Sequence, residues 1–141
     1  MRRLTVLTIV LSALLATSAM AARPDSIGVR STAYGRVLVG GGGYALYAFT
    51  RDGRGASRCY GACAQAWPPL IVPRRPHATH GARSSLIATR RRTDGRLQAT
   101  YRGRPLYSYV GDRRPGQVLC QNVVEFGGRW LVVRASGRLV R

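Results

Sequence analysis

The sequence predicts an all-β fold in which two pseudo-symmetric antiparallel β-meander repeats pack into one small domain. The first observation is an internal repeat, because residues 27–54 align without a gap to residues 87–114 with nine identical pairs. Two unrelated windows of this length would share roughly two identities, so one structural unit is used twice. The second observation is that each copy contains short alternating runs separated by glycine-containing turns, which is typical of β-hairpins.

Residues 1–21 are predicted to be a signal peptide. Arg2 and Arg3 precede an apolar run, and Ala19-Met20-Ala21 has the small-x-small pattern of a cleavage site. The apolar run of about thirteen residues is shorter than the roughly twenty that span a bilayer, so we predict no transmembrane segment. The first cysteine is Cys59, far from the cleavage site. We therefore expect a secreted or extracytoplasmic protein of the periplasm or cell wall that is not lipid-anchored.

Residues 22–141 are long enough for a single all-β domain with a modest core. Residues 22–25 are expected to be a loose tail, and repeat one covers residues 27–72. Its expected elements are two strands around Tyr34-Gly35, a third strand after a glycine turn, one helical turn and an extended edge segment containing two prolines, at 27–33, 36–40, 44–50, 60–65 and 67–69.

Residues 73–84, with two prolines and both histidines, are expected to form an exposed linker. Repeat two covers residues 85–140. Its expected strands are a hairpin around Asp94-Gly95, a third strand, a fourth strand and a short return across Ser136-Gly137, at 86–92, 96–101, 104–110, 129–134 and 138–140. The two meanders are predicted to pack about an approximate two-fold axis.

A Tyr-x-x-x-x-Asp motif ends the third strand of each repeat, as Tyr47 to Asp52 and as Tyr107 to Asp112. The structural interpretation is that each aspartate accepts a hydrogen bond from a backbone N–H two residues on and so starts a turn. The functional interpretation is that the rings and the carboxylate form a small-ligand or cation site.

Alternation along the third strands places two aromatic side chains of each repeat on one face. Rings of this size dominate burial in a small domain, so we expect them to form the core together with both tryptophans. The alternative is an exposed shelf that stacks against sugars or bases. The rings concerned are Tyr47, Phe49, Tyr107, Tyr109, Trp67 and Trp130.

Three cysteines in an exported chain indicate oxidation. We predict a Cys59–Cys63 disulfide. Residues four apart on a regular helix have Cβ atoms about 5–6 Å apart, which exceeds the roughly 3.5–4.5 Å of a disulfide, so this bond needs an irregular turn that Gly61 permits. A Cys63–Cys120 link would close a longer loop and stabilise by about 4 kcal/mol instead of about 2 kcal/mol. With the local bond formed, Cys120 is left buried, paired with another molecule or, alternatively, redox-active.

Other chemical signals in the sequence are weak. His77-x-x-His80 has a spacing that binds metals on a helix, but Pro76 and Gly81 favour a loop and further ligands are not evident. We find no acid–base pair, phosphate loop or catalytic triad pattern. The sequence predicts no cofactor, and a noncatalytic protein is favoured over an enzyme.

All 23 basic residues are arginine, and the formal net charge is +18. Such a charge favours contact with polyanions such as cell-wall polymers. The arginines are scattered instead of forming a stripe, so no specific nucleic-acid site is predicted, and weak nonspecific anion binding is the simpler interpretation. We therefore expect an exported binding or structural module with a basic surface. The alternative is an extracytoplasmic redox or electron-transfer accessory protein using cysteines or a bound metal. The oligomeric state is not determined by the sequence.

Several segments together carry a family resemblance, at 46–52, 59–63, 67–70, 106–112 and 127–130. With them the chain resembles bacterial extracytoplasmic proteins and lipoproteins built from the secreted repeat of unknown function, which is marked by a Tyr-x-(Phe/Trp/Tyr)-x-x-Asp motif. The resemblance covers about residues 36–137. It implies a cell-envelope or secreted repeat protein and carries no assigned chemistry. This chain departs from many members by lacking the lipid-attachment cysteine.

Overall fold

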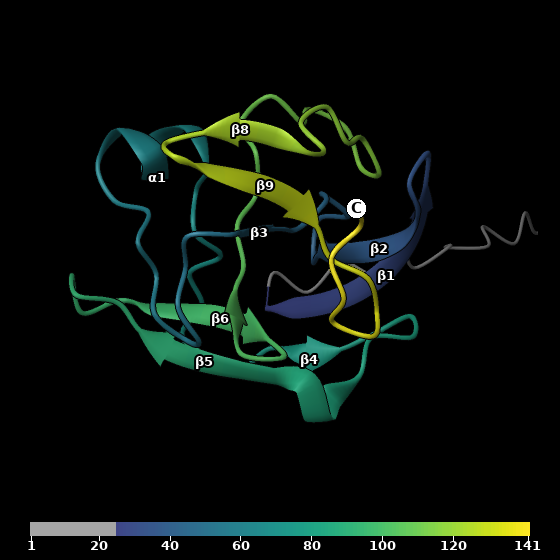
Figure 1. Cartoon of the computed structure of the whole chain (residues 1–141). Coiled ribbons are helices and arrows are strands. Elements are labelled where there is room, and N and C mark those ends of the chain that lie inside the picture. Colours follow the sequence, from purple (N-terminus) through teal and green to yellow (C-terminus); the bar gives the residue numbers. More distant parts are fainter. Residues whose placement is uncertain (1–24) are drawn as a thin grey trace, which may run out of the picture.

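The computed structural model describes residues 25–141, so the predicted signal peptide lies outside the described residues. The all-β prediction is confirmed, because short strands form three small sheets, and the short helix α1 lies at the edge of the molecule (Figure 1). The sheet orders are β2-β1-β4, β3-β9-β8 and β5-β6-β7. The elements are β1 Ser26–Thr32, β2 Gly35–Gly40, β3 Tyr47–Phe49, α1 Ala62–Ala66, β4 His77–Ala78, the 3-10 turn η1 Ser84–Leu86, β5 Ile87–Arg91, β6 Leu97–Tyr101, β7 Arg104–Pro105, β8 Val123–Glu125 and β9 Gly128–Val132.

Each repeat begins with the predicted hairpin. In repeat one, β1 and β2 are closed by the pair Thr32 and Gly35, so the turn lies one residue before the expected position. In repeat two, β5 and β6 are joined by a turn in which Arg92 N–H donates to the Arg96 carbonyl at 2.8 Å. Asp94 Oδ1 accepts the Arg96 N–H at 3.1 Å, and this contact holds the turn.

The third strands of the two repeats meet at the pseudo-two-fold axis. Tyr47 and Tyr107, which are equivalent residues, exchange backbone hydrogen bonds of 2.8 and 3.0 Å. β3 of repeat one then pairs with β9 of repeat two, and Tyr107 of repeat two bridges to Pro69 of repeat one. Each repeat therefore supplies its fourth segment to the third strand of the other, and the two meanders interlock.

Both faces of β3 are buried. Leu46 and Ala48 belong to a core cluster of mainly aliphatic side chains, whereas Tyr47 and Phe49 belong to a second cluster that contains both tryptophans. The predicted alternation is thus confirmed. It separates two cores instead of separating a core from solvent, because the other repeat covers the second face.

The expectation of an exposed linker at residues 73–84 is wrong in its central part. His77 and Ala78 form β4, which pairs in parallel with β1, and Pro76 is buried. The N–H groups of His77 and Thr79 donate to carbonyls at residues 25 and 27, so this segment completes an open sheet edge. The expectation of a loose tail is also wrong at Asp25, whose carboxylate lies 2.9 Å from Arg74.

Two other expectations differ in detail. The third strands are shorter than predicted, because Ala45 before β3 and Tyr107 after β7 form only isolated bridges. β8 was not predicted. It returns to β9 through a two-residue turn at Phe126 and Gly127, with φ of 53° and 75°. A phenylalanine in the left-handed region is uncommon, so Phe126 itself gives no turn signal, although Gly127 and Gly128 follow it.

The end of the chain follows the prediction. Val133 bridges to Leu139, and the Gly137 N–H donates to the Arg134 carbonyl at 2.8 Å, so the chain reverses across Ser136-Gly137. The helical turn expected at residues 60–65 is present as α1, two residues later at its start. Within residues 25–141, none of the helices has the length and apolar character needed to cross a bilayer.

Candidate functional site

The repeat motifs form a reciprocal pair of hydrogen bonds. The Tyr47 hydroxyl donates to Asp112 Oδ2 at 2.7 Å, and the Tyr107 hydroxyl donates to Asp52 Oδ2 at 2.6 Å. Each tyrosine therefore bonds the aspartate of the other repeat. The two motifs lie on either side of the pseudo-two-fold axis, and their polar groups hold the halves together.

The second oxygen of each carboxylate closes a loop. Asp52 Oδ1 accepts the Arg58 N–H at 2.8 Å, and Asp112 Oδ1 accepts the Leu119 N–H at 2.9 Å. The turn expected two residues after each aspartate is thus wrong in its span, because the N–H partners lie six and seven residues on. Both oxygens of each carboxylate therefore accept hydrogen bonds that stabilise the fold.

Burial controls the protonation of this network. Desolvation raises the pKa of Asp52, and the hydrogen bonds from Tyr107 and Arg58 oppose that rise. Desolvation and the partner carboxylates raise the pKa of both Tyr47 and Tyr107 above the ordinary value. The phenols therefore stay protonated as donors well into alkaline pH.

The aromatic side chains of the motif stack with both tryptophans. Trp67 and Trp130 are fully buried, with ring centroids 4.1 Å apart and an interplanar angle of 3°. Phe49 stacks on Trp130 at 4.2 Å, and its counterpart Tyr109 lies 4.7 Å from Trp67. The four rings form a column through the axis. The tryptophans are thus core residues and offer no open face to a ligand.

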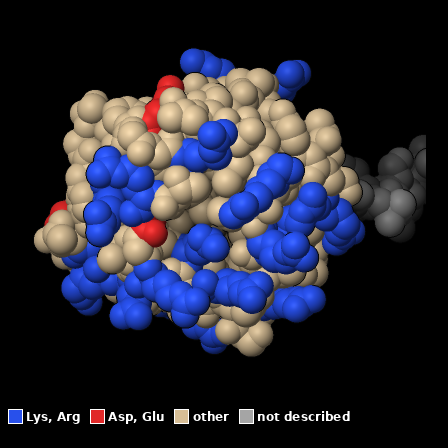
Figure 2. Space-filling model, in the orientation of Figure 1, with Lys and Arg blue, Asp and Glu red and all other residues tan. Residues whose placement is uncertain are grey.

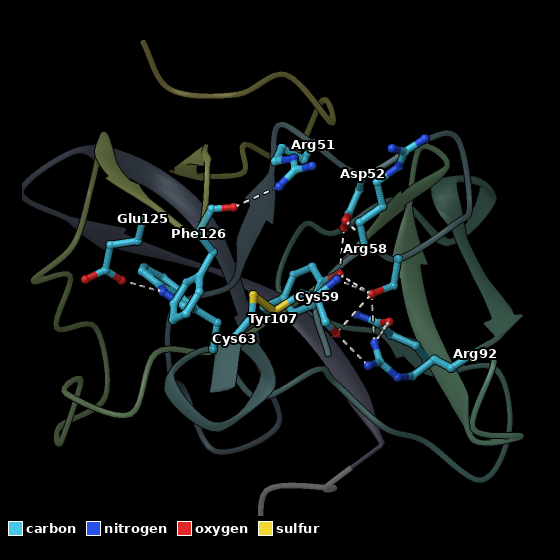
Figure 3. Close-up of a disulfide and its surroundings, with 12 residues drawn as sticks. Arg51, Asp52, Arg58, Cys59, Cys63, Arg92, Tyr107, Glu125 and Phe126 are labelled. Atoms are coloured by element: carbon cyan, nitrogen blue, oxygen red, sulfur yellow. Dashed lines mark hydrogen bonds between the residues drawn. A yellow bond between two sulfur atoms is a disulfide. The ribbon is translucent and has the colours of Figure 1, made fainter. Parts of the chain in front are cut away.

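The two tryptophans differ in their polar partners. Trp67 Nε1 donates to Glu125 Oε2 at 2.8 Å (Figure 3). Trp130 Nε1 is buried and has no hydrogen-bond partner among the described residues. Glu125 lies on β8, which has no strand counterpart in repeat one, where α1 occupies the corresponding part of the chain. The pseudo-symmetry therefore breaks at this position.

A buried arginine that sequence reasoning missed organises the loop after β3. Arg92 donates to Ser57 Oγ at 2.9 Å, to Gln98 Oε1 at 2.8 Å and to the Cys59 carbonyl at 2.7 Å. Ser57 Oγ also lies 2.7 Å from the Tyr107 hydroxyl. Figure 3 shows Arg92 reaching toward this group from repeat two. The strand alternation of Arg90-Arg91-Arg92 was the only available signal, and it could not say which arginine is buried.

Cys59 and Cys63 form a disulfide, with Cα atoms 5.2 Å apart. Gly61 between them has a φ of 55°, which supplies the irregular turn that the short loop needs. Cys120 is the free cysteine of the described residues and is half-buried. It lies beside Tyr109, and this contact raises the pKa of Tyr109.

The histidines do not come together at a site. His77 lies on β4 and His80 is in a turn with φ of 48°, and both are exposed. In the part of the chain that the structure describes, no group of three His, Cys, Asp or Glu side chains is arranged to hold a metal ion.

Arginines dominate the surface, and they gather around two adjoining hollows. Figure 2 shows them spread over most of one face with few acids between them. The hollows have volumes of about 680 and 800 Å³ and share Arg104 and Arg138. We call the pair the arginine trough. Its charged lining consists of Arg54, Arg102, Arg104, Arg134, Arg138 and Arg141, together with Asp52.

The five acidic residues all have hydrogen-bond or ion-pair partners other than these arginines, and this includes Asp52 in the trough lining. Asp25 pairs with Arg74, and Asp94 pairs with Arg92 and Arg96, while the other three carboxylates accept the tyrosine and tryptophan hydrogen bonds described above. Hydrogen bonding to Arg96 lowers the pKa of Asp94 to about 2. Within residues 25–141, the trough arginines have no carboxylate in salt-bridge contact.

A family model described as a secreted repeat of unknown function matches the chain twice, at residues 28–71 and 88–134. No curated protein and no solved structure matches the chain. The first match contains the edge segment at residues 67–69, which bridges to Tyr107, and the second match contains β9. Both segments that pair with the other repeat therefore lie inside the matched regions. The chain therefore belongs to the family of secreted repeats of unknown function.

Proposed function

We propose that this protein is a noncatalytic binding module of the cell envelope or secreted space, and that its basic surface contacts polyanions such as cell-wall polymers. The observation that carries the proposal is the arginine trough, where several guanidinium groups surround a concave surface and the lining carboxylate of Asp52 is hydrogen-bonded to Tyr107 and Arg58 instead of pairing with them. Uncompensated charge around a hollow raises the local potential and attracts polyanions.

The use of the repeat motifs supports the same proposal. Asp52 and Asp112 each have both oxygens hydrogen-bonded, and the motif rings pack in the core. The motif that defines the repeat thus builds the scaffold. Binding is left to the exposed side chains that this scaffold presents.

Retention on anionic material tests the proposal. The mature chain is applied to isolated cell-wall fragments and to carboxylate and phosphate matrices, and elution is followed as the salt concentration rises. We expect strong retention at low ionic strength and release at about 0.5 M salt, because the Debye length falls from about 10 Å at 0.1 M to about 3 Å at 1 M. No retention at low salt, or retention that salt does not change, would overturn the proposal.

Export is part of the proposal. The family is described as secreted, and the first 21 residues have the pattern of a cleavable signal. We expect the protein outside the cytoplasm to begin at Ala22 and to stay in the aqueous phase on detergent partitioning. N-terminal sequencing and mass determination of the exported protein check both points, and an added lipid mass would contradict the absence of an anchor.

A further inference from the structure

We propose that the arginine trough is a binding site for a linear phosphate polymer and that it holds two consecutive phosphate groups, with Arg104 and Arg138 between them. This inference rests on the proposed function and names the ligand chemistry and the place of binding. The two hollows are adjoining and share these two arginines, so one chain of repeating anions can occupy both.

Three segments that are distant in sequence build the trough. Arg54 comes from the loop after β3, Arg102 and Arg104 come from the turn that enters β7, and the remaining arginines come from the C-terminal residues 134–141. The fold therefore brings these exposed arginines together. Because they are far apart in the sequence, no run of basic residues indicates the site.

One trough arginine is held in place by the backbone. The Arg102 Nη1 donates to the Ser136 carbonyl at 3.2 Å. A Cβ added to Gly137 would lie 2.7 Å from both Cβ and Cδ of Arg102, so the arginine packs directly on the glycine. A side chain already fixed before binding loses less entropy when a ligand binds.

The turn that carries Arg102 and Arg104 differs in charge between the two repeats. The repeat-one residues equivalent to Arg102-Gly103-Arg104 are Gly42-Gly43-Tyr44. The chain at 115–116 covers that turn, because the Gly116 N–H donates to the Gly43 carbonyl at 2.9 Å. The repeat fold therefore does not require arginine at positions 102 and 104. We infer that these two arginines serve binding and not folding.

Guanidinium groups from several directions favour phosphate over carboxylate. A carboxylate is planar and is matched by the fork of one arginine, whereas the oxygens of a phosphate point in different directions and accept from several arginines at once. Arginines on three separate segments around two hollows fit the second geometry. The shared pair Arg104 and Arg138 can contact both neighbouring phosphates.

The test measures binding of the mature chain at fixed salt to inorganic polyphosphate, to poly(glycerol phosphate) and to poly-glutamate of similar charge. The test variant is Arg104→Gln with Arg138→Gln. The charge-matched control is Arg113→Gln with Arg114→Gln, two exposed arginines outside the trough, of which Arg114 is the repeat equivalent of Arg54. Loss of two exposed charge contacts predicts roughly tenfold weaker phosphate-polymer binding for the test variant and less than about twofold for the control.

A second variant moves a guanidinium without changing the charge. Gly137→Ala displaces Arg102 and also strains the turn beside Arg138, because Gly137 has a φ of 80°, and we expect weaker binding at unchanged net charge. Cooperative unfolding of each variant is recorded so that loss of folding is separated from loss of binding.

Each outcome decides one point. Tighter binding of either phosphate polymer than of poly-glutamate, lost in the trough variant and kept in the control, supports the inference. Equal losses in test and control variants, or equal affinity for poly-glutamate, overturn the inference while leaving the proposed polyanion contact standing. Absence of binding to all three polymers at low fixed salt overturns the proposed function as well.

Discussion

The tyrosine hydroxyls of the repeat motif explain why this motif pairs a tyrosine with an aspartate five residues on. Asp112 is buried at 5% exposure and accepts the Tyr47 hydroxyl from the other repeat. A buried carboxylate without its donors is costly, so the two residue types depend on each other across the axis. The two aspartates therefore stabilise the fold, although carboxylates are also common in catalytic and ligand-binding sites.

Substituting Tyr47→Phe should destabilise the protein by about 1–3 kcal/mol, because the buried carboxyl group of Asp112 loses a hydrogen-bond donor. Urea unfolding checks this value. The matched control is Tyr44→Phe, whose ring is 39% exposed and whose loss of a hydroxyl should change stability by less than about 0.5 kcal/mol. Equal effects of the two substitutions would contradict the proposed role of the hydroxyl.

Alkaline pH should unfold the protein through the same tyrosines. Their pKa is raised above the ordinary 10.0 in the folded state, so the resulting stability is complete below pH 10 and falls as the pH rises above it, where the unfolded chain loses protons that the folded chain keeps. Tyrosinate absorbance should show a step that coincides with unfolding by circular dichroism. That step should shrink in Tyr47→Phe with Tyr107→Phe, and a gradual titration of all phenols before unfolding would count against this assignment.

The state of the cysteines can be counted directly. We expect one alkylated cysteine, Cys120, when the protein is denatured without reductant, and three after reduction, because Cys59 and Cys63 form the disulfide. Peptide mapping by mass spectrometry gives both numbers. A Cys63–Cys120 peptide, or no free thiol in the monomer, would show a different connectivity.

At the scale of elements, strand exchange decides how the aromatic column forms. β9 carries Trp130 from repeat two onto β3 of repeat one, where it stacks on Phe49. The edge segment of repeat one carries Trp67 toward Tyr109 in the same way. Each short strand is thus stabilised by rings from the other repeat, since strands of three residues have little stability alone.

Gly128 at the start of β9 should be intolerant of a side chain. An added Cβ would lie 2.5 Å from Phe49 Cε2 and 2.7 Å from Arg51 Cγ, so Gly128→Ala must displace the stacked ring and should cost about 1–3 kcal/mol. Gly40→Ala in β2 is the control, because its nearest contact would be an ordinary 3.8 Å to Leu46 Cδ2. Thermal unfolding of both variants checks the difference, and similar melting temperatures would disprove the steric argument.

At the scale of the whole molecule, both repeats contribute side chains to each of the two core clusters. The aliphatic cluster takes Ile27 and Leu38 from repeat one and Tyr101 and Leu106 from repeat two. The aromatic cluster likewise mixes both repeats. Neither half therefore contains a complete core.

Separate chains of residues 22–81 and 82–141 should each be unfolded and should assemble one-to-one when mixed. The cut falls after the exposed Gly81 and preserves β4 with its partner β1, while the buried contacts between halves remain available. Circular dichroism and light scattering after size exclusion check the assembly. Cooperative unfolding of one fragment alone would show that the repeats are independent domains.

The hairpins, the turn at Asp94-Gly95, the short helix and the C-terminal return were predictable because each depends on local patterns of alternation and turn residues. β4 and β8 were not predictable, since a two-residue strand and a turn with Phe126 at positive φ are stabilised by partners elsewhere in the chain. The motif residues were recognised from repetition, but their partners were assigned within one repeat. Arg92 was missed because burial of an arginine depends on acceptors from other segments, here the loop at Ser57 and Cys59 and the strand at Gln98.

The sequence by itself determined that one all-β unit occurs twice, where its two hairpins lie, and that the chain is strongly basic, because periodicity, turn chemistry and charge are local or additive properties. Only the tertiary structure decided that the repeats exchange strands, that each tyrosine bonds the opposite aspartate and that scattered arginines converge on one trough. These features depend on distances between residues far apart in the chain, and such distances exist only once both cores have formed.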